Sequence, residues 1–200
     1  MKILALIGSY RKGGVIDLSI DEVLAAARDA GAETEKIYLI DKHIEFCTNC
    51  RTCTQQAGER RGTCPQNDEM AALLDAIEAS DGIVLGSPMN FWTVTAVTKR
   101  FIERLVCFAY WPWGKPAPKT RKLQKDKRAV IVASSAAPAL LARPLTKLVR
   151  LLKEVAGLLG ANVVGVLYIG LAAGEQHPVL RKRTKRRAHR LGRALAGVPR

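Results

Sequence analysis

The sequence has no signal-peptide pattern and no unbroken apolar segment of membrane-spanning length. Its opening, MKILALIGSY, passes from an apolar stretch directly into a Gly-Ser pair without a small-residue cleavage site. The uncharged stretch 156–174 approaches the length of a membrane span, but the turn residues of GLLGAN and three later glycines interrupt it. These absences argue against a secreted or membrane-spanning class and predict a soluble, cytoplasmic protein.

Internal repeats and linker-like segments are also missing. The chain has 200 residues, and 48% of them are hydrophobic. A chain of this size and composition can bury one substantial core. We therefore expect a single domain over residues 1–200.

Acidic residues are absent from the last 20 positions. Residues 181–200 carry nine Lys and Arg and no Asp or Glu, and residues 115–128 carry seven basic residues and one Asp. The net charge of +14 is therefore concentrated in two segments, and the rest of the chain is close to neutral. This distribution argues against a global nucleic-acid surface and leaves a local patch to explain.

The basic C-terminal segment has the pattern of an amphipathic helix over about 179–196. Leu180, Ala188, Leu191 and Leu195 fall on one face, so the cations form the solvated side. Little aromatic sequence is interleaved with the charge, as stacking on bases would require. Nucleic-acid binding is therefore the least favoured use of this helix.

Strand and helix patterns alternate along the chain. Apolar runs typical of buried strands lie at 2–8, 34–40, 82–88, 128–135 and 162–170. Helical spacing of apolar residues covers 20–27, 70–77, 97–108, 145–159 and 179–196. This alternation predicts an α/β fold with a doubly wound, five-stranded parallel sheet and helices on both faces. In such sheets ligands bind beyond the carboxyl ends of the strands.

The loop after the first strand, GSYRKGG, has the chemistry of a phosphate site. It matches neither a GxGxxG fingerprint nor a GxxxxGK[ST] loop. Ser9 offers a hydroxyl, Arg11 and Lys12 offer cations, and Gly13 and Gly14 expose backbone N–H groups at a helix start. A Gly-rich turn with two solvated cations is the alternative interpretation.

Two further loops follow strands and could line a ligand. GSPMNFW places Pro88, Met89, Asn90, Phe91 and Trp92 at the carboxyl edge, where flat apolar groups suit a planar ligand. The same residues could instead belong to the core or to an interface.

The loop that begins at SSAAP adds Ser134 and Ser135 at the end of the fourth predicted strand. Both serines are candidates for contacts with a bound cofactor.

Four of the five cysteines lie within one short segment, at Cys47, Cys50, Cys53 and Cys64. An odd number of cysteines in a chain able to build its own core favours reduced thiols or a bound metal over disulfides. The C-x2-C-x2-C spacing suits a [4Fe-4S] cluster closed by Cys64, and a four-cysteine zinc site is chemically similar. The ten-residue charged loop before Cys64 weighs toward free thiols, so all three alternatives stay open. Cys107, in an apolar helical setting, is expected to be buried.

Three motifs in order resemble the flavodoxin-like NADPH-dependent FMN reductase family, particularly its iron–sulfur flavoprotein branch. They are GSYRKGG, the cysteine pattern CTNCRTC…C…NDEM, and GSPMNFWTVTAVTKRFIER, within residues 1 to about 104. The resemblance implies a flavodoxin-like sheet of order 2-1-3-4-5 and bound FMN, with its phosphate at Ser9 and Arg11 and its ring system beside Pro88 to Trp92. It also implies hydride transfer from NAD(P)H through FMN to a second acceptor, with no catalytic acid or base from the chain.

The first loop departs from the family pattern after its glycines. Val15 and Ile16 stand where the family usually has Asn and Thr, whose side chains help to hold the phosphate. Asp17 then places a carboxylate near the helix start, where it opposes a phosphate electrostatically. The Ser19-x-x-Glu22 spacing also predicts a capping box at this helix.

Aromatic residues make up only 6% of the chain, yet four of them gather at Phe108, Tyr110, Trp111 and Trp113. They open a segment, 109–126, that we expect to be irregular and basic. The cluster could form a subunit interface, a roof over the flavin or a minor core under the loop. The first alternative predicts a homodimer or homotetramer.

Three functional interpretations follow. The leading one is an FMN-dependent NAD(P)H oxidoreductase that reduces a small acceptor such as a quinone, a flavin or an azo compound. The second is an iron–sulfur flavoprotein electron carrier without a small substrate of its own. The third is a nucleic-acid-binding or regulatory protein that acts through its basic helix.

Overall fold

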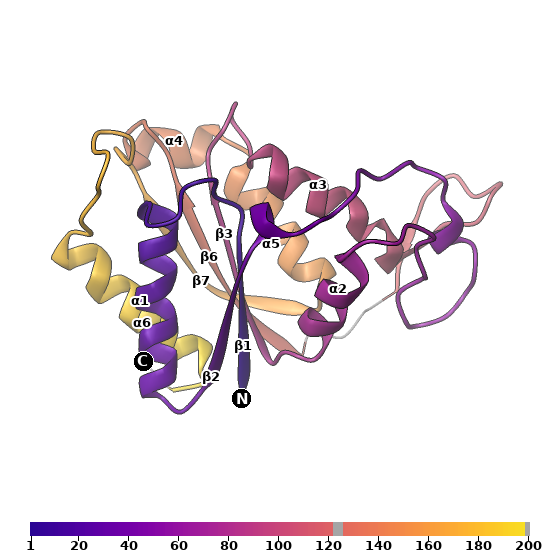
Figure 1. Cartoon of the computed structure of the whole chain (residues 1–200), viewed down its shortest axis with the longest axis horizontal. Helices are drawn as coiled ribbons and strands as arrows, with labels where there is room; N and C mark the ends of the chain where they lie inside the picture. Colours follow the sequence, from indigo (N-terminus) through magenta and orange to yellow (C-terminus); the bar gives the residue numbers. More distant parts are fainter. Residues whose placement is uncertain (122–125, 199–200) are drawn as a thin grey trace.

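The structure is a computed structural model that describes residues 1–121 and 126–198. At its centre lies a parallel sheet with the strand order β2-β1-β3-β6-β7 (Figure 1). Its strands are β1 Lys2–Ile7, β2 Glu33–Tyr38, β3 Gly82–Pro88, β6 Lys127–Ser134 and β7 Ala161–Ile169. Every neighbouring pair in this sheet is parallel. The predicted order 2-1-3-4-5 is confirmed, because β4 and β5 form a separate ribbon.

Helices cover both faces of the sheet, as predicted. The helices α1 (Val15–Asp29) and α6 (Lys182–Leu195) pack on one face, on the left in Figure 1. The helices α2 (Met70–Glu78), α3 (Ala96–Arg104) and α5 (Leu148–Leu158) pack on the other. Because parallel strands need a crossover connection, helices fill both surfaces of the sheet.

Side chains of β1 alternate between two apolar clusters. Ile3, Ala5 and Ile7 pack with residues of α1 and α6. Leu4 and Leu6 pack with residues of the opposite helical layer. Successive side chains of a strand point to opposite faces, and here both faces are buried. This explains why β1 reads as a continuous apolar run rather than an alternating one.

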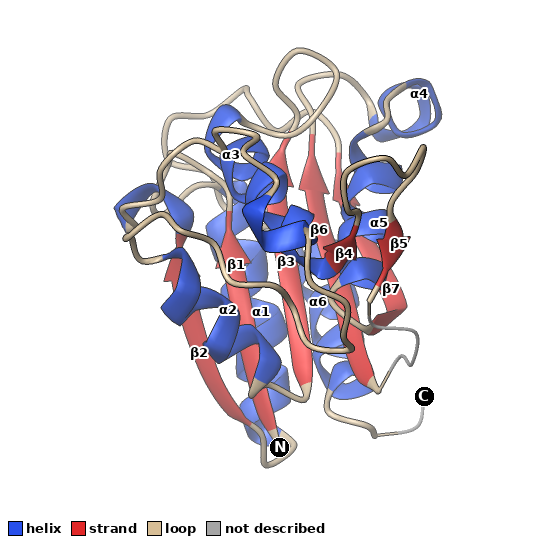
Figure 2. Cartoon of the chain, turned by 90° about the vertical axis from the view of Figure 1, so that its right-hand side faces the viewer, coloured by secondary structure: helices blue, strands red, loops and turns tan. Residues whose placement is uncertain are grey.

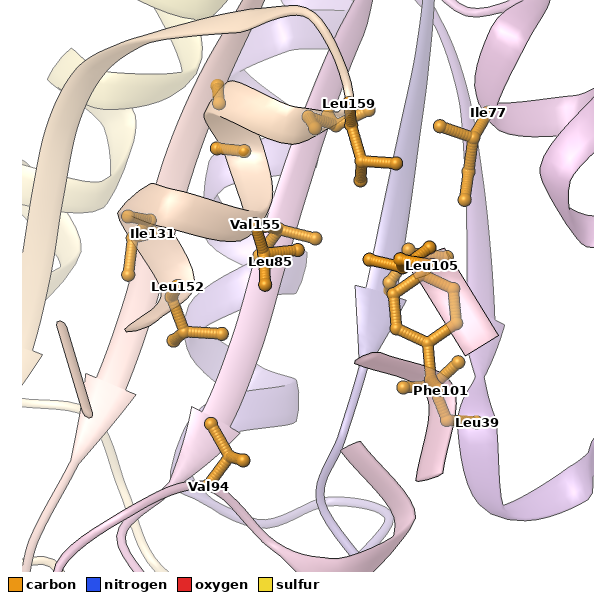
Figure 3. Packing of buried hydrophobic residues seen from close by; sticks show 14 of the residues in the cluster. Leu39, Ile77, Leu85, Val94, Phe101, Leu105, Ile131, Leu152, Val155 and Leu159 are labelled. Carbon is orange, nitrogen blue, oxygen red and sulfur yellow. The ribbon is translucent and has the colours of Figure 1, made fainter. Parts of the chain in front are cut away.

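The layer of α2, α3 and α5 is held by a dense apolar cluster. Figure 3 shows Leu85 of β3 and Ile131 of β6 on the side where Leu152 and Val155 of α5 pack. Phe101 of α3 is also fully buried in this cluster. The predicted buried face of the helix over 97–108 is thereby confirmed, although its last residues, Leu105–Phe108, form a 3₁₀ turn.

The helix predicted over 145–159 is wrong at its beginning. Leu145 ends a short separate helix, α4 (Ala139–Leu145), and its side chain is exposed. Thr146 has extended backbone angles, so the helical register breaks there and α5 starts only at Leu148. Leu145 therefore never reaches the core.

The segment expected to be irregular at 109–126 contains some regular structure. Ala109–Tyr110 (β4) and Lys119–Thr120 (β5) pair as an antiparallel ribbon, visible in front of the sheet in Figure 2. Residues 122–125 of this segment lie outside the described residues. The predicted basic helix over about 179–196 is confirmed as α6, and Ala188, Leu191 and Leu195 are buried.

Backbone hydrogen bonds bring the three predicted ligand loops to one edge of the sheet. The Gly8 N–H donates to the Gly86 carbonyl over 2.7 Å, which joins the loops after β1 and β3. The Met89 N–H donates to the Ser134 carbonyl over 2.7 Å, which joins the loops after β3 and β6. Figure 2 shows these loops gathered beyond the arrowheads of the strands.

Candidate functional site

The β1–α1 loop ends in a helix start suited to an anion. Gly13 has φ +74°, a conformation that favours glycine, and Gly14 precedes the first residue of α1. The first N–H groups of the helix, those of Val15 and Ile16, have no partner inside it. The predicted capping box at Ser19 is wrong, because α1 begins four residues earlier and Ser19 is a buried residue inside it.

A carboxylate of the chain already occupies this loop. Asp17, in the first turn of α1, is 4% exposed, and its Oδ2 accepts a hydrogen bond from the Gly13 N–H over 2.6 Å. The Tyr38 hydroxyl donates to the same carboxylate over 2.9 Å, and Lys36 Nζ lies 2.9 Å from Oδ1. Burial alone would raise the pKa of Asp17, but the contacts with Gly13, Lys36 and Tyr38 hold that pKa below its usual value.

Lys36 joins two carboxylates at the same place. Its Nζ also lies 2.7 Å from Oδ1 of Asp21 on the next turn of α1. Burial alone would lower the pKa of Lys36. The hydrogen bonds to Asp21 and Asp17 outweigh this effect, so the pKa of Lys36 is raised. Lys36 therefore stays charged and fixes Asp17 beside the loop.

The two predicted phosphate cations are engaged within the chain. Lys12 Nζ lies 2.6 Å from Asp41 Oδ2, with both side chains about half exposed. The Arg11 guanidinium donates to the backbone carbonyl of Gln176, in the loop after β7. Both contacts lie at the surface, so a ligand phosphate could replace them.

The structure adds a buried hydroxyl network that the sequence analysis missed. Thr95 Oγ1 donates to the Gly8 carbonyl over 2.6 Å and lies 2.8 Å from Thr98 Oγ1. Thr95 is also the N-cap of α3, where its hydroxyl accepts from the Thr98 N–H. A Cβ at Gly8 would lie 1.8 Å from Thr98 Oγ1, so any side chain there would displace the Thr98 hydroxyl from this network. The T-x-x-T spacing after the GSPMNFW loop was the available signal for this network.

The predicted ring-binding loop projects from the sheet edge instead of entering the core. Asn90 and Thr93 exchange backbone hydrogen bonds of 2.9 and 3.0 Å, which close a tight turn. Phe91 and Trp92 at its tip have φ of +45° and +68°, and their exposures are 98% and 65%. Positive φ at bulky residues is strained, and such strain gathers at ligand sites. The core interpretation of these two rings is therefore wrong.

Ser134 and Ser135 lie buried at the same edge. The Ser135 hydroxyl donates to the Ala137 carbonyl over 2.8 Å, and its N–H donates to the Ile169 carbonyl. In this arrangement the Ser135 side chain holds its own loop.

The four clustered cysteines line one small cavity. Cys47, Cys50, Cys53 and Cys64 all contribute to its wall, together with Arg104. The long loop before Cys64 is packed tightly, because a Cβ at Gly62 would lie 1.7 Å from the Cys53 carbonyl oxygen. The length of that loop, which weighed toward free thiols, therefore does not keep Cys64 away from the other three.

The thiols of this cavity differ in their environments. A hydrogen bond from the Thr52 hydroxyl lowers the pKa of the exposed Cys50. Burial raises the pKa of Cys53, and the neighbouring Cys64, Cys47 and Cys50 raise it further. Cys107 is buried as predicted, and burial raises its pKa to about 12.

Arg104, which the sequence analysis did not single out, is the buried cation of this cavity. Its guanidinium forms a bidentate pair with Asp68, and these side chains are 2% and 1% exposed. It also donates to Cys64 Sγ over 3.4 Å and to the Glu45 carbonyl over 2.9 Å. Asp68 Oδ1 further accepts from the N–H of Met70, the first residue of α2.

Two more arginines make contacts that hold the cysteine loop against the segment that follows α3. The Arg51 guanidinium lies over the rings of Trp111 and Trp113, 3.9 and 4.1 Å from their centres. Arg121 donates to the carbonyls of Cys53, Gln56, Gly58 and Ala109. The aromatic segment therefore packs along the cysteine loop, away from the sheet (Figure 1).

A single ion and a cluster make different demands on the positions of the donor atoms. A structural zinc ion needs four sulfurs about 2.3 Å from one point. Within residues 1–121 and 126–198, no three His, Cys, Asp or Glu side chains are grouped closely enough to hold one metal ion. In a [4Fe-4S] cluster each thiolate binds a different iron, so the sulfurs surround a larger volume.

The strand order, the loop N–H groups at the carboxyl edge and the exposed aromatic turn define a flavodoxin-like protein. The sequence matches the family of NADPH-dependent FMN reductases over residues 1–176. The chain belongs to that family.

Two similar proteins are named iron–sulfur flavoproteins. The one from Archaeoglobus fulgidus is 36% identical over 112 residues, which are 56% of this chain and 49% of that protein. The one from Methanocaldococcus jannaschii is 36% identical over 104 residues, 52% of this chain and 51% of the relative. The chain thus aligns with about half the length of these relatives.

Solved structures confirm the fold. An azoreductase from Bacillus anthracis superimposes with a TM-score of 0.66 at 17% identity, covering 98% of both chains. A flavone reductase gives a TM-score of 0.62 at 23% identity, covering 98% of this chain and 62% of the other. In the part of the chain that the structure describes, no helix is both long and apolar enough to cross a membrane.

Proposed function

We propose that the chain is an FMN-dependent NAD(P)H oxidoreductase that reduces a small acceptor such as a quinone, a flavin or an azo compound. The observation that carries this proposal is the meeting of three loops, after β1, β3 and β6, at the carboxyl edge of the sheet. Open α/β sheets bind their ligands at this edge. The family match and the names of the similar solved proteins support the same chemistry.

Each loop has a distinct task in this proposal. The N–H groups of Val15 and Ile16, with Arg11 and Lys12, would hold the FMN phosphate. The turn with Phe91 and Trp92 would cover the ring system and keep water from it. FMN itself supplies the hydride and electron chemistry, and the chain binds and orients it.

Absorbance and turnover test this function. Protein purified without air is expected to contain or take up FMN and to oxidise NADPH or NADH rapidly with menadione as acceptor. Absence of flavin binding contradicts the proposal. Flavin binding with negligible menadione turnover favours the electron-carrier alternative, which needs only an exposed flavin edge.

The cysteine cavity supports a second element of this function, a [4Fe-4S] cluster bound by Cys47, Cys50, Cys53 and Cys64. The four cysteines line one cavity, and the guanidinium of Arg104 donates to the sulfur of Cys64. The relatives named iron–sulfur flavoproteins support the same assignment.

Metal analysis tests the cluster. We expect about four irons per chain and matching acid-labile sulfide in anaerobic protein. Cys50→Ser should remove both while FMN stays bound, and Cys107→Ser is the matched control that should retain them. Stoichiometric zinc, or no metal at all, would contradict the assignment.

We also propose that the chain forms a homodimer or homotetramer. The contact would include the aromatic segment from Phe108 to Trp113, where Trp113 is 66% exposed, as interface residues are in isolated chains. Light scattering at micromolar concentration is expected to show an oligomer, and a monomer would contradict it.

A further inference from the structure

The phosphate loop of this chain carries its own anion. Asp17 is nearly fully buried at the start of α1, where its carboxylate accepts the Gly13 N–H at 2.6 Å. Val15 and Ile16 precede it in the same turn and bring no polar side chain to the site. The loop therefore presents a fixed negative charge at the position where a flavin phosphate would need neutral or positive groups.

Asp17 cannot move away from the loop at low cost. The Tyr38 hydroxyl lies 2.9 and 3.0 Å from its two carboxylate oxygens, and Lys36 Nζ lies 2.9 Å from Oδ1. The ammonium of Lys36 is shared with Asp21, so it does not fully offset Asp17. A phosphate that approaches the helix start meets a carboxylate that is already held in place.

The remaining cations near the loop are already engaged within the chain. Lys12 pairs with Asp41, and the Lys12 ammonium lies 4.9 Å from the centre of the Tyr38 ring. Arg11 donates to a neutral carbonyl, so within the described part of the chain it is the loop cation without a carboxylate partner. A phosphate group therefore gains less from this site than its glycines and cations alone suggest.

We propose that Asp17 is a specificity-determining residue that weakens the preference of this site for a phosphorylated flavin over riboflavin. The proposal rests on the proposed flavin function. Riboflavin carries the same ring system without the phosphate, so the carboxylate charge affects only FMN. The site would accept phosphate-free flavins nearly as well as FMN and would release FMN readily.

A different role for Asp17 has to be separated from this one. The carboxylate also orders Gly13 in its left-handed conformation, and loss of that order would weaken FMN binding. Asn at position 17 can still accept the Gly13 N–H with its amide oxygen but carries no charge. Asp17→Asn therefore removes the charge and keeps an acceptor for the loop.

The experiment measures dissociation constants for FMN and riboflavin by flavin fluorescence, on the full chain freed of flavin, at one fixed ionic strength. In Asp17→Asn the FMN constant is expected to fall about tenfold, which corresponds to about 1.4 kcal/mol. The riboflavin constant is expected to stay within about twofold. Asp21→Asn, which also contacts Lys36 but not the loop, is the matched control and should leave the ratio of the two constants unchanged.

Each other outcome counts against the inference. Weaker FMN binding in Asp17→Asn shows that the carboxylate orders the loop, and unchanged FMN binding shows that its charge does not act on the phosphate. A parallel change for both flavins shows that no phosphate is involved. If Asp17→Asn fails to fold, Asp17→Ser tests the same ratio with another neutral acceptor. Binding of neither flavin to wild type or variant removes the proposed function and this inference with it. Tight FMN binding with an unchanged ratio overturns the inference alone.

Discussion

The phosphate loop at residues 8–14 and the cysteine loop at residues 47–64 are both rich in cations, but they use them in opposite ways. In the first loop Lys12 and Arg11 are exposed and make contacts that a ligand can replace. Around the cysteine loop, Arg104 at the end of α3 and Arg121 after β5 are buried and bonded to groups of the chain. A basic residue in or beside a loop therefore indicates a ligand site only when its charge remains accessible to solvent.

Solvation explains the difference in energy between the two loops. An exposed pair such as Lys12 with Asp41 contributes little, because water solvates both partners nearly as well. The buried pair of Arg104 with Asp68 has lost that water, so each partner depends on the other. Single substitutions should therefore have small effects on stability at the cations of the first loop and large ones at the buried arginines that contact the cysteine loop.

Arg104→Met should have the largest effect on folding. It leaves the Asp68 carboxylate buried without its cation, and breaking such a pair costs about 3–5 kcal/mol. Urea denaturation measures the change in the free energy of unfolding. Arg104→Met combined with Asp68→Leu is the matched control, since it removes both charges and should recover much of the loss. A loss below about 1 kcal/mol in the single variant would contradict the comparison.

Arg121→Met should have the next largest effect. It deprives four backbone carbonyls of a charged donor, and loss of charged hydrogen bonds costs about 1.5–3 kcal/mol. We expect faster hydrogen exchange across residues 53–58 and easier proteolysis of that stretch. Lys119→Met, an exposed change in β5, is the control and should leave exchange unaltered. Unchanged protection in Arg121→Met would show that the loop is held by other contacts.

The pH dependence of stability tests the buried pair of Arg104 and Asp68 in a second way. Burial alone would raise the pKa of Asp68. The contacts with Arg104 and two backbone N–H groups outweigh this effect, so the pKa of Asp68 is lowered. A group whose pKa is lower in the folded state adds stability above its unfolded value of 3.8, and that contribution disappears as pH falls through the folded pKa. Wild type should thus lose stability more steeply below about pH 4 than Asp68→Asn. Parallel pH profiles in urea denaturation would argue against a role for Asp68.

Much of the fold could be predicted from the sequence, because the central strands β1, β3 and β6 are buried on both faces and read as apolar runs. The phosphate loop and the aromatic turn could also be predicted, since glycines after a strand and a Gly-Ser-Pro sequence at a strand end are local patterns. The contacts of the arginines could not be predicted from the sequence. Arg104 and Arg121 reach partners that lie 12 to 68 residues away in the chain, and no local pattern encodes such pairs. The misplaced capping box at Ser19 has a similar origin, because Gly14 starts the helix earlier than a Ser-based pattern predicts.

In the phosphate loop, the largest effect should appear in ligand binding instead of folding. Arg11→Ala is expected to weaken FMN binding by about 1.5–3 kcal/mol, because a charged donor to the phosphate is lost. A flavin titration measures the change, and riboflavin binding serves as the control that should stay the same. Equal losses for both flavins would place the phosphate away from Arg11.

Lys12→Met should have the smallest effect on stability and gives the sharpest contrast with Arg104→Met. Lys12 and Asp41 are 56% and 49% exposed, so their pair contributes no more than about 1 kcal/mol to folding. If Lys12 instead serves the ligand, its removal should weaken FMN binding at low salt and matter less as salt rises, because exposed charges are screened. Urea denaturation and FMN titration at two salt concentrations measure both quantities on one variant. A stability loss approaching that of Arg104→Met would mean that Lys12 is structural, and the distinction between the two loops would then fail.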